Sequence, residues 1–208
     1  MRIVKKLEIR KNEILDAAEK LFTAKGFERA TVNDILDELG IAKGTFYHYF
    51  TSKEDALDAI VSRRIESGLE KARLIAASCD LGVHEKMLAV IMAQKPENQV
   101  QEEFTSVLHE QENALLHQKI LVQCVLGLSP ILQGIAEEGI ENGSFSTLFP
   151  KESIEILLTS ALVLFDDGYF KWEPEEMAVK IPAFLCAMER ILGAKANSFA
   201  DFVQAFST

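Results

Sequence analysis

The stretch from Lys43 to Phe50 combines residue types that suit contact with a nucleic acid. Lys43, Gly44 and Thr45 place a cation, a residue without a side chain and a hydroxyl group at a predicted helix start. At a helix N-terminus, the exposed backbone N–H groups and the helix dipole favour phosphate. Side-chain donors there can also reach base edges in the major groove of DNA.

Aromatic residues follow on the same predicted helix, and their spacing decides which of them face outward. Phe46 and Phe50 are four residues apart, so they share one side of the helix and suit packing. Tyr47, His48 and Tyr49 lie between them, and at 100° per residue at least two of these must face away from the core. A polar and aromatic outward face is typical of a binding surface.

Two preceding helices are predicted to position this segment. The first runs from Leu7 to Lys25. The second follows Thr31, which forms an approximate capping box with Asp34, and it ends at Gly40. A three-residue turn then leads to the helix over 43–50, and this order is the geometry of a helix-turn-helix, whose second helix enters a major groove.

The rest of the chain also has helical periodicity, and strand alternation is nearly absent. A capping box of Ser52 and Asp55 opens a long helix through about Ser78. Pro182 is expected to kink or split the last long helix. Further helices are expected over 84–94, 97–109, 113–128, 131–142, 151–170 and 175–192, with a short one over 199–206. We therefore predict an all-α protein with a three-helix DNA-binding domain over 1–50 and a larger helical domain over 51–208.

The net charge of -10 does not exclude a nucleic-acid partner, because the acidic residues lie towards the C-terminus. The first 64 residues hold 12 basic and 11 acidic residues, and the remainder holds 10 and 21. Apolar residues make up 48% of the chain, enough to bury a core. The apolar runs are too short to span a bilayer, and the start of the chain does not resemble a secretory signal, so we expect a soluble cytoplasmic protein without a membrane partner.

The sequence offers little support for catalysis, a metal or a cofactor. It contains no nucleophile-elbow, phosphate-loop, dinucleotide or zinc-protease motif, so we expect no enzyme activity and no cofactor. His109 and His117 raise the question of a metal site. If both lie on one helix, they share a face but stand roughly 12 Å apart along its axis, too far to share an ion. We therefore expect no metal.

The motif residues closely resemble the signature of the tetracycline-repressor (TetR) family. The signature runs from Gly40 to Phe50 and continues in Ser52-Lys53-Glu54, and residues 14–18, 21–22 and 26–27 resemble the first helix of that family. The resemblance covers about residues 10–60 and implies a dimeric transcriptional regulator, usually a repressor, that a small molecule releases from its operator. Ala42 departs from the pattern, because many members carry a Ser there that caps the second helix.

The resemblance also implies roles for individual residues. Five positions match residues that approach base edges or adjacent phosphates, namely Lys43, Gly44, Thr45, Tyr47 and His48. Three match phosphate contacts, namely Thr31, Tyr49 and Lys53. The alternatives are that Thr31 serves only as a cap, that Tyr49 packs, and that His48 is solvated without a role.

For the C-terminal domain the resemblance implies effector binding and dimerisation. Large side chains that could line an effector cavity, or equally fill it, are Met87, Ile91, Phe104, Leu108, Leu116, Val122, Phe165 and Tyr169. The last two long helices carry apolar stripes broader than one intrachain contact needs, so we predict a dimer interface that contains Ile154, Leu157, Leu158, Ala161, Leu162, Phe184, Leu185 and Met188.

Two functions fit these observations. The first is a regulator that binds a palindromic operator as a homodimer and is released by a small, largely apolar effector. The alternative is a DNA-anchored protein-interaction factor without an effector, and a filled C-terminal core would favour it.

Overall fold

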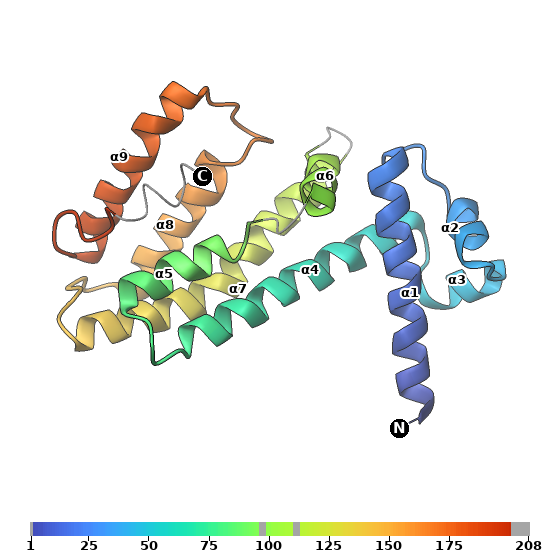
Figure 1. Ribbon diagram of the computed structural model, residues 1–208, viewed down its shortest axis with the longest axis horizontal. Helices are drawn as coiled ribbons and strands as arrows, with labels where there is room; N and C mark the ends of the chain where they lie inside the picture. The colour runs from blue at the N-terminus through green and yellow to red at the C-terminus, as the bar shows by residue number, and fades with distance from the viewer. Residues whose placement is uncertain (1, 96–98, 110–112, 201–208) are drawn as a thin grey trace. The chain divides into compact units, whose positions relative to one another are not determined.

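The computed structural model describes residues 2–95, 99–109 and 113–200 (Figure 1). Regular structure in these residues is helical throughout, which confirms the predicted all-α class. Within the described ranges there are nine helices: α1 (Arg2–Lys25), α2 (Val32–Leu39), α3 (Lys43–Tyr49), α4 (Lys53–Ala76), α5 (Val83–Met92), α6 (Gln99–Leu108), α7 (Ala114–Glu141), α8 (Pro150–Leu164) and α9 (Pro174–Leu192).

Helices α1 and α2 form as the apolar spacing and the caps predict. Ile14, Ala18 and Phe22 recur every four residues along α1 and are fully buried. Gly26 follows the helix with a φ of 78°, and Gly40 ends α2 with a φ of 62°, both in the left-handed region that glycine adopts without strain. α1 begins at Arg2, five residues before the predicted start, because no Gly or Pro interrupts the helix there.

The chain divides into two compact units, and the division differs from the predicted boundary at residue 50. The first unit runs through Glu66 and also takes α6 and the start of α7, to His117. The first half of α4 belongs here because Leu57, Ile60 and Val61 are buried. Arg64 of α4 forms an ion pair with Glu19 of α1, and its guanidinium lies 4.3 Å from the centre of the Phe104 ring of α6.

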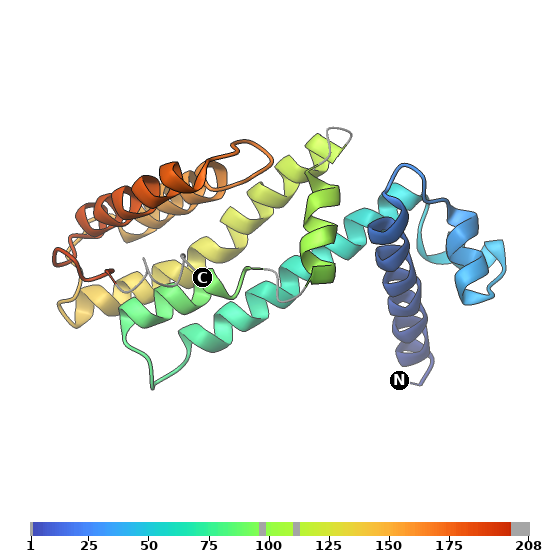
Figure 2. The ribbon, with the colours of Figure 1, turned by 45° about the horizontal axis from the view of Figure 1, so that its top comes forward.

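The second unit takes Ser67–Lys95 and the chain from Gln118 onward. The later halves of α4 and α7 pack closely in it, because Gly127 brings no side chain and a Cβ there would lie 2.6 Å from a methyl group of Leu69. Helices α8 and α9 lie side by side (Figure 2). Buried residues that form this core include Leu69, Ala72, Met87, Val90, Leu128, Leu132 and Ile135.

Prolines interrupt the helices less than the sequence predicts. α7 runs unbroken through Pro130, where two helices were expected, and α9 runs through Pro182. Pro130 is exposed, so water can satisfy the carbonyl of Leu126 that loses its N–H partner. Leu128 and Leu132 are buried on either side of it and hold the helix in place.

α8 is shorter than predicted and ends at Leu164 instead of Phe170. The indole N–H of Trp172 donates to the carbonyl of Leu164 over 2.7 Å, which supplies a partner for one of the last carbonyls of the helix. Phe199 and Ala200 lie in a turn, and the remainder of the predicted 199–206 helix falls outside the described residues.

By length and composition alone, α7 is apolar enough to cross a membrane, whereas the apolar runs of the sequence predict no such segment. Core helices of globular proteins pass the same test. Leu128, Leu132, Ile135 and Ala136 of α7 are buried within the second unit. The apolar character of α7 is therefore explained in part by packing within the chain.

Candidate nucleic-acid interface and apolar groove

Helix α3 is held by its apolar side and presents its polar side to solvent. Phe46 and Phe50 are buried, with exposed fractions of 0% and 2%, and their ring centres are 5.7 Å apart. Tyr47 is 46% exposed and His48 is exposed, whereas Tyr49 is half-buried. The predicted orientation of the helix is therefore confirmed.

The first turn of α3 has no side-chain cap, although the backbone N–H of Thr45 donates to the carbonyl of Ala42 over 2.8 Å. Ala42 is the N-cap and makes no side-chain cap hydrogen bond. A Cβ on Gly44 would meet no atom within 4 Å, so packing within the protein does not require glycine there. Lys43 places its ammonium 5.8 Å from the centre of the Tyr47 ring. The turn is open to a ligand that carries phosphate.

Thr31 is occupied as the cap of α2. Its hydroxyl donates to Asp34 Oδ2 over 2.8 Å and accepts from the backbone N–H of Asp34, which forms the predicted capping box. Hydrogen bonds from Lys25 and then from Thr31 lower the pKa of Asp34 to about 2. The capping role of Thr31 is confirmed, and its contact with phosphate stays a prediction.

Lys53 has a structural role that its place in the sequence does not reveal. Its Nζ donates to the carbonyl oxygens of Phe27, Glu28 and Ala30 at 2.9, 3.3 and 3.4 Å, and lies 4.3 Å from the centre of the Phe27 ring. All three carbonyls belong to the α1–α2 loop, so Lys53 joins the start of α4 to that loop. The ammonium is engaged there, which argues against the predicted phosphate contact.

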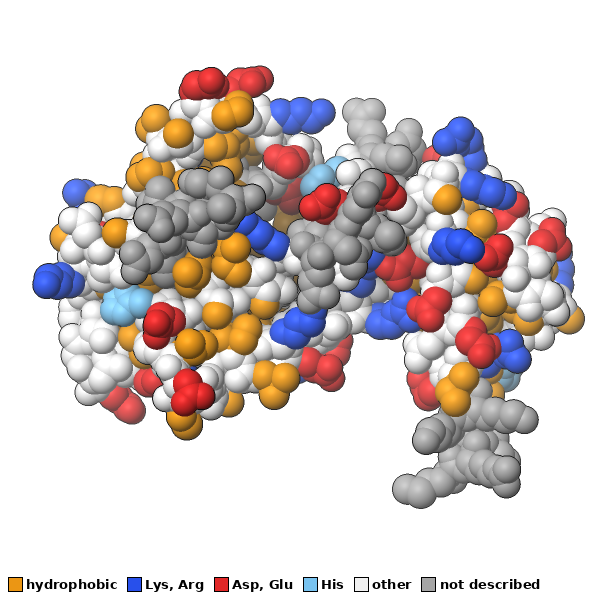
Figure 3. Space-filling view, viewed as in Figure 1, with side chains coloured by type: hydrophobic (Ala, Val, Ile, Leu, Met, Phe, Trp, Pro, Cys, Tyr) orange, Lys and Arg blue, Asp and Glu red, His pale blue; other side chains and the backbone are white. Residues whose placement is uncertain are grey.

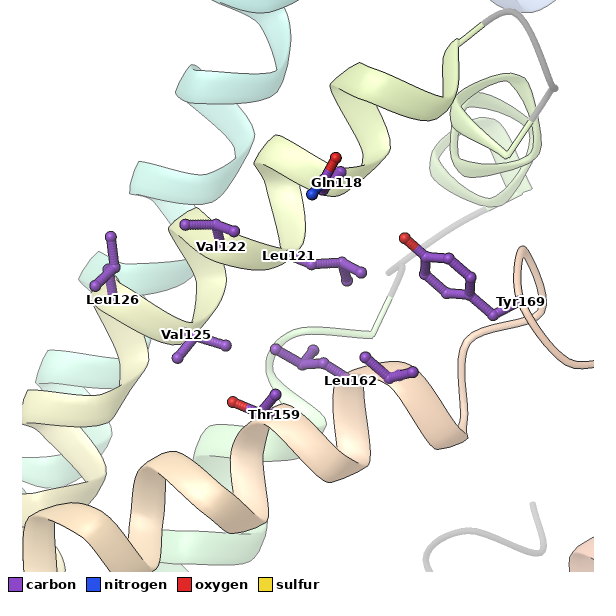
Figure 4. Close-up of a pocket in the computed structure, with 9 residues that line it drawn as sticks. Gln118, Leu121, Val122, Val125, Leu126, Thr159, Leu162 and Tyr169 are labelled. Atoms are coloured by element: carbon purple, nitrogen blue, oxygen red, sulfur yellow. The ribbon is translucent and has the colours of Figure 1, made fainter.

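An apolar groove of about 330 Å³ lies between α7 and α8 (Figure 4). Tyr169 closes one end of it from the segment after α8, and Gln118 and Thr159 add polar atoms. Its other lining residues are Leu121, Val122, Val125, Leu126, Leu162 and Val163.

The groove contains two of the eight residues predicted to line an effector cavity, Val122 and Tyr169. Met87, Phe104 and Leu108 are instead buried in the core, and the lining of this groove does not include Ile91, Leu116 or Phe165. The sequence signal for the rest of the lining was the spacing of Leu121, Val122, Val125 and Leu126, which recur three and four residues apart along α7. Sequence periodicity alone does not say which side of an apolar helix stays uncovered.

Five of the eight residues predicted at a dimer interface face the core of their own chain. Ile154, Leu157, Leu158, Leu185 and Met188 are buried, so they have little surface to give to a partner. Ala161, Leu162 and Phe184 are half-buried, and Leu162 lines the groove. The apolar stripes predicted from the sequence are broad because α8 and α9 each carry apolar residues both towards the core and towards the surface. Figure 3 shows hydrophobic side chains at the surface over α9.

The assumption that His109 and His117 share one helix is wrong. His109 follows the end of α6, and His117 lies in the first turn of α7. The change of direction between the helices brings the two ring centres to 4.7 Å, instead of the 12 Å expected along a helix axis.

Comparison with known proteins identifies the architecture. A sequence profile of bacterial regulatory proteins of the tetR family matches residues 14–60, and a profile of the tetracycline-repressor-like C-terminal domain matches residues 96–187. The chain belongs to the TetR family. Members of this family are DNA-binding transcriptional regulators, and the first profile covers α2, the turn and α3.

Relatives with similar sequences include other regulators. The repressor KstR2 of Rhodococcus jostii is 42% identical over 69 residues, which is 33% of this chain and 34% of that protein. The fatty acid metabolism regulator of Bacillus subtilis is 26% identical over 155 residues, which is 73% of this chain and 76% of that protein. The match to KstR2, and the matches to two further regulators from Bacillus subtilis and Lactococcus lactis, span only about a third of the length of each of those proteins.

Solved structures share the fold at lower identity. The complex of RolR with resorcinol has a TM-score of 0.61 at 18% identity and covers 96% of this chain and 95% of RolR. A TetR/AcrR-family regulator from Thermobifida fusca has a TM-score of 0.58 at 23% identity and covers 85% of this chain and 96% of its own.

Proposed function

We propose that this TetR-family regulator represses transcription in the bacterial cytoplasm. It binds a palindromic operator as a homodimer, and a small, largely apolar effector releases it. The structure of α3 supports this proposal most directly. Its buried side holds Phe46 and Phe50, its exposed side holds Tyr47 and His48, and its first turn is open at Gly44. This is what a helix needs in order to enter a major groove and stay at a fixed angle.

Mutating the exposed side of α3 tests the DNA contact. Lys43→Ala and Tyr47→Ala should both weaken operator binding without lowering the melting temperature, because both side chains lie outside the core. Lys43→Ala should also reduce the salt slope of binding by roughly one unit if it contacts phosphate. Lys195→Ala is the control, since Lys195 is exposed and lies beyond α9. Unchanged affinity of both α3 variants at two salt concentrations contradicts the assignment.

The groove between α7 and α8 supports the effector part of the proposal. Its walls are mostly Leu and Val, and Gln118, Thr159 and Tyr169 can orient a ligand by hydrogen bonds. The related RolR was solved with the aromatic ligand resorcinol, and a relative in Bacillus subtilis is named for fatty acid metabolism. The resorcinol bound to RolR fits an effector with an apolar body.

Helix α4 can transmit effector binding to the DNA-binding unit. It is one continuous helix whose residues through Glu66 belong to the first unit and whose residues from Ser67 belong to the second. An effector that binds better when α4 has tilted changes the separation of the two recognition helices in a dimer. Since these must enter successive major grooves about 34–36 Å apart, operator affinity falls.

A thermal-shift screen of apolar and aromatic compounds tests the groove. A true effector stabilises the folded protein by about 2.7 kcal/mol at a hundred times its dissociation constant. Val125→Trp should fill the groove and abolish that shift while leaving operator binding intact. Leu74→Trp is the control, because Leu74 is exposed on α4 and does not line the groove.

A DNA-anchored interaction factor without an effector is the second candidate. The observation that favours it is the filled core at Met87, Phe104 and Leu108, where a cavity was possible. If no compound shifts the melting temperature and Val125→Trp changes nothing, this second function replaces the effector part of the proposal. The DNA-binding part then stands on the α3 variants alone.

A further inference from the structure

His109 and His117 lie close together at the junction of α6 and α7, within the first compact unit. The backbone N–H of His109 donates to the carbonyls of Thr105 and Ser106 at 3.2 Å, which fixes His109 just past the end of α6. His117 is only 7% exposed in the first turn of α7. Their ring planes are tilted by 48°, and each offers a nitrogen within 4.8 Å of the other.

This arrangement is close to the geometry of two ligands on one metal ion. Imidazole nitrogens bind Zn²⁺ at about 2.0–2.1 Å, so two of them on a tetrahedral ion stand about 3.4 Å apart. Small side-chain rotations bring nitrogens 4.8 Å apart or less to that separation. We propose that His109 and His117 together bind one divalent transition-metal ion, of the kind that imidazole prefers, such as Zn²⁺, Co²⁺ or Ni²⁺.

The position of the pair gives the ion a structural consequence. An ion held by both rings joins the end of α6 to the start of α7. α6 also carries Phe104, which is fully buried and lies under the guanidinium of Arg64. Arg64 in turn pairs with Glu19 of α1. The ion therefore stabilises α6, which packs against α1 within the first unit, and this inference does not depend on the effector groove.

Metal titration of the full-length chain, free of any tag and dialysed against a chelator, tests the proposal. Calorimetry with Zn²⁺ and visible absorption with Co²⁺ should both give one ion per chain. His109→Ala and His117→Ala should each weaken binding by roughly tenfold or more. The chain has four histidines, so His48→Ala and His84→Ala are matched controls that should bind as the wild type does.

A measurement on the wild-type chain covers the case in which His117→Ala fails to fold. Pulsed electron paramagnetic resonance on the Cu²⁺-loaded protein counts the imidazoles bound to the ion, and two are expected. His109→Ala, at the half-buried position, should reduce the count to one. The proposal is overturned if the wild type shows no saturable binding, if the count is below two, or if His48→Ala or His84→Ala abolishes binding instead.

Discussion

At the scale of single residues, neighbours decide which polar groups remain available to DNA. Lys43 and Lys53 look equivalent in the sequence, since each begins a helix next to the predicted interface. Lys53 is held by three carbonyls of the α1–α2 loop, whereas Lys43 has only the Tyr47 ring nearby among the contacts that the structure describes for its ammonium. The two lysines should therefore respond differently to mutation.

Lys53→Ala should lower the free energy of unfolding by about 1–2 kcal/mol, because charge-assisted hydrogen bonds to loop carbonyls are lost. Its salt slope for operator binding should stay close to the wild-type value, while that of Lys43→Ala falls by roughly one unit. Urea denaturation and binding titrations at several salt concentrations measure both quantities. A stable Lys53→Ala variant with a reduced slope instead supports a phosphate contact.

Gly44→Ala separates protein stability from DNA contact. The added methyl group meets nothing in the protein, so the free energy of unfolding should stay the same or rise by up to about 1 kcal/mol. Operator affinity should nevertheless fall by roughly tenfold or more, because base-edge contacts worth about 1–3 kcal/mol are lost if the backbone cannot approach the duplex.

Gly134→Ala is the matched control for Gly44→Ala, since Gly134 is an exposed helical glycine of α7 with nothing within 4 Å of its Cβ position. It should gain similar stability and bind the operator normally. Equal operator affinity of the two variants and the wild type means that the backbone at Gly44 does not approach DNA.

At the scale of helices, packing contacts explain features of α7 that its composition does not predict. Composition makes α7 look like two helices split by Pro130, or like a membrane span, yet in the structure it is one helix packed on α4 at Gly127. The absence of a side chain at that position lets the Leu69 side chain reach the backbone of α7.

Gly127→Ala should therefore destabilise the protein by about 1–3 kcal/mol, despite the better helix propensity of alanine, because the new methyl group overlaps Leu69. The double variant Gly127→Ala with Leu69→Ala should be less unstable than the sum of the two single changes. Thermal and urea unfolding measure this, with Gly134→Ala as the control on the same helix. If the stability changes of the two single variants add up to that of the double variant, the packing explanation is wrong.

At the scale of the whole molecule, the proposed homodimer, if it is built on α8 and α9, uses their outer sides, because the inner residues are buried in the chain's own core. Ile156 of α8 is 57% exposed and Val179 of α9 is 69% exposed, and Ala183 and Cys186 extend the exposed side of α9. These residues alternate with the buried ones that the sequence analysis assigned to the interface. The proposed dimer therefore rests on the opposite side of the same two helices.

Ile156→Glu combined with Val179→Glu should give folded monomers that bind only a half-site, and weakly, because each charge lies in the proposed interface and outside the core. Leu158→Glu should unfold the chain instead, since Leu158 is buried. Leu74→Glu, at an exposed position on α4, is the control that should remain dimeric. Sedimentation of a folded, dimeric double variant excludes this interface.

The sequence by itself determined the local features. The stripe of Ile14, Ala18 and Phe22, the capping box of Thr31 and Asp34, and the outward face of α3 follow from interactions within a few residues along the chain. The resemblance carried by residues 40–54 was equally local, and the family profile confirms it.

Only the tertiary structure decided which sides of the C-terminal helices are covered. A helix with two apolar sides has no periodicity that tells core from groove or from interface, so the sequence did not show that Leu158 lies in the core and Ile156 at the surface. The same reason applies to Lys53 and to the pair His109 and His117. The partners of these residues lie on other helices and loops that are distant in the sequence or separated by a change of direction. Packing of the chain brings them together, and spacing along the sequence does not predict it.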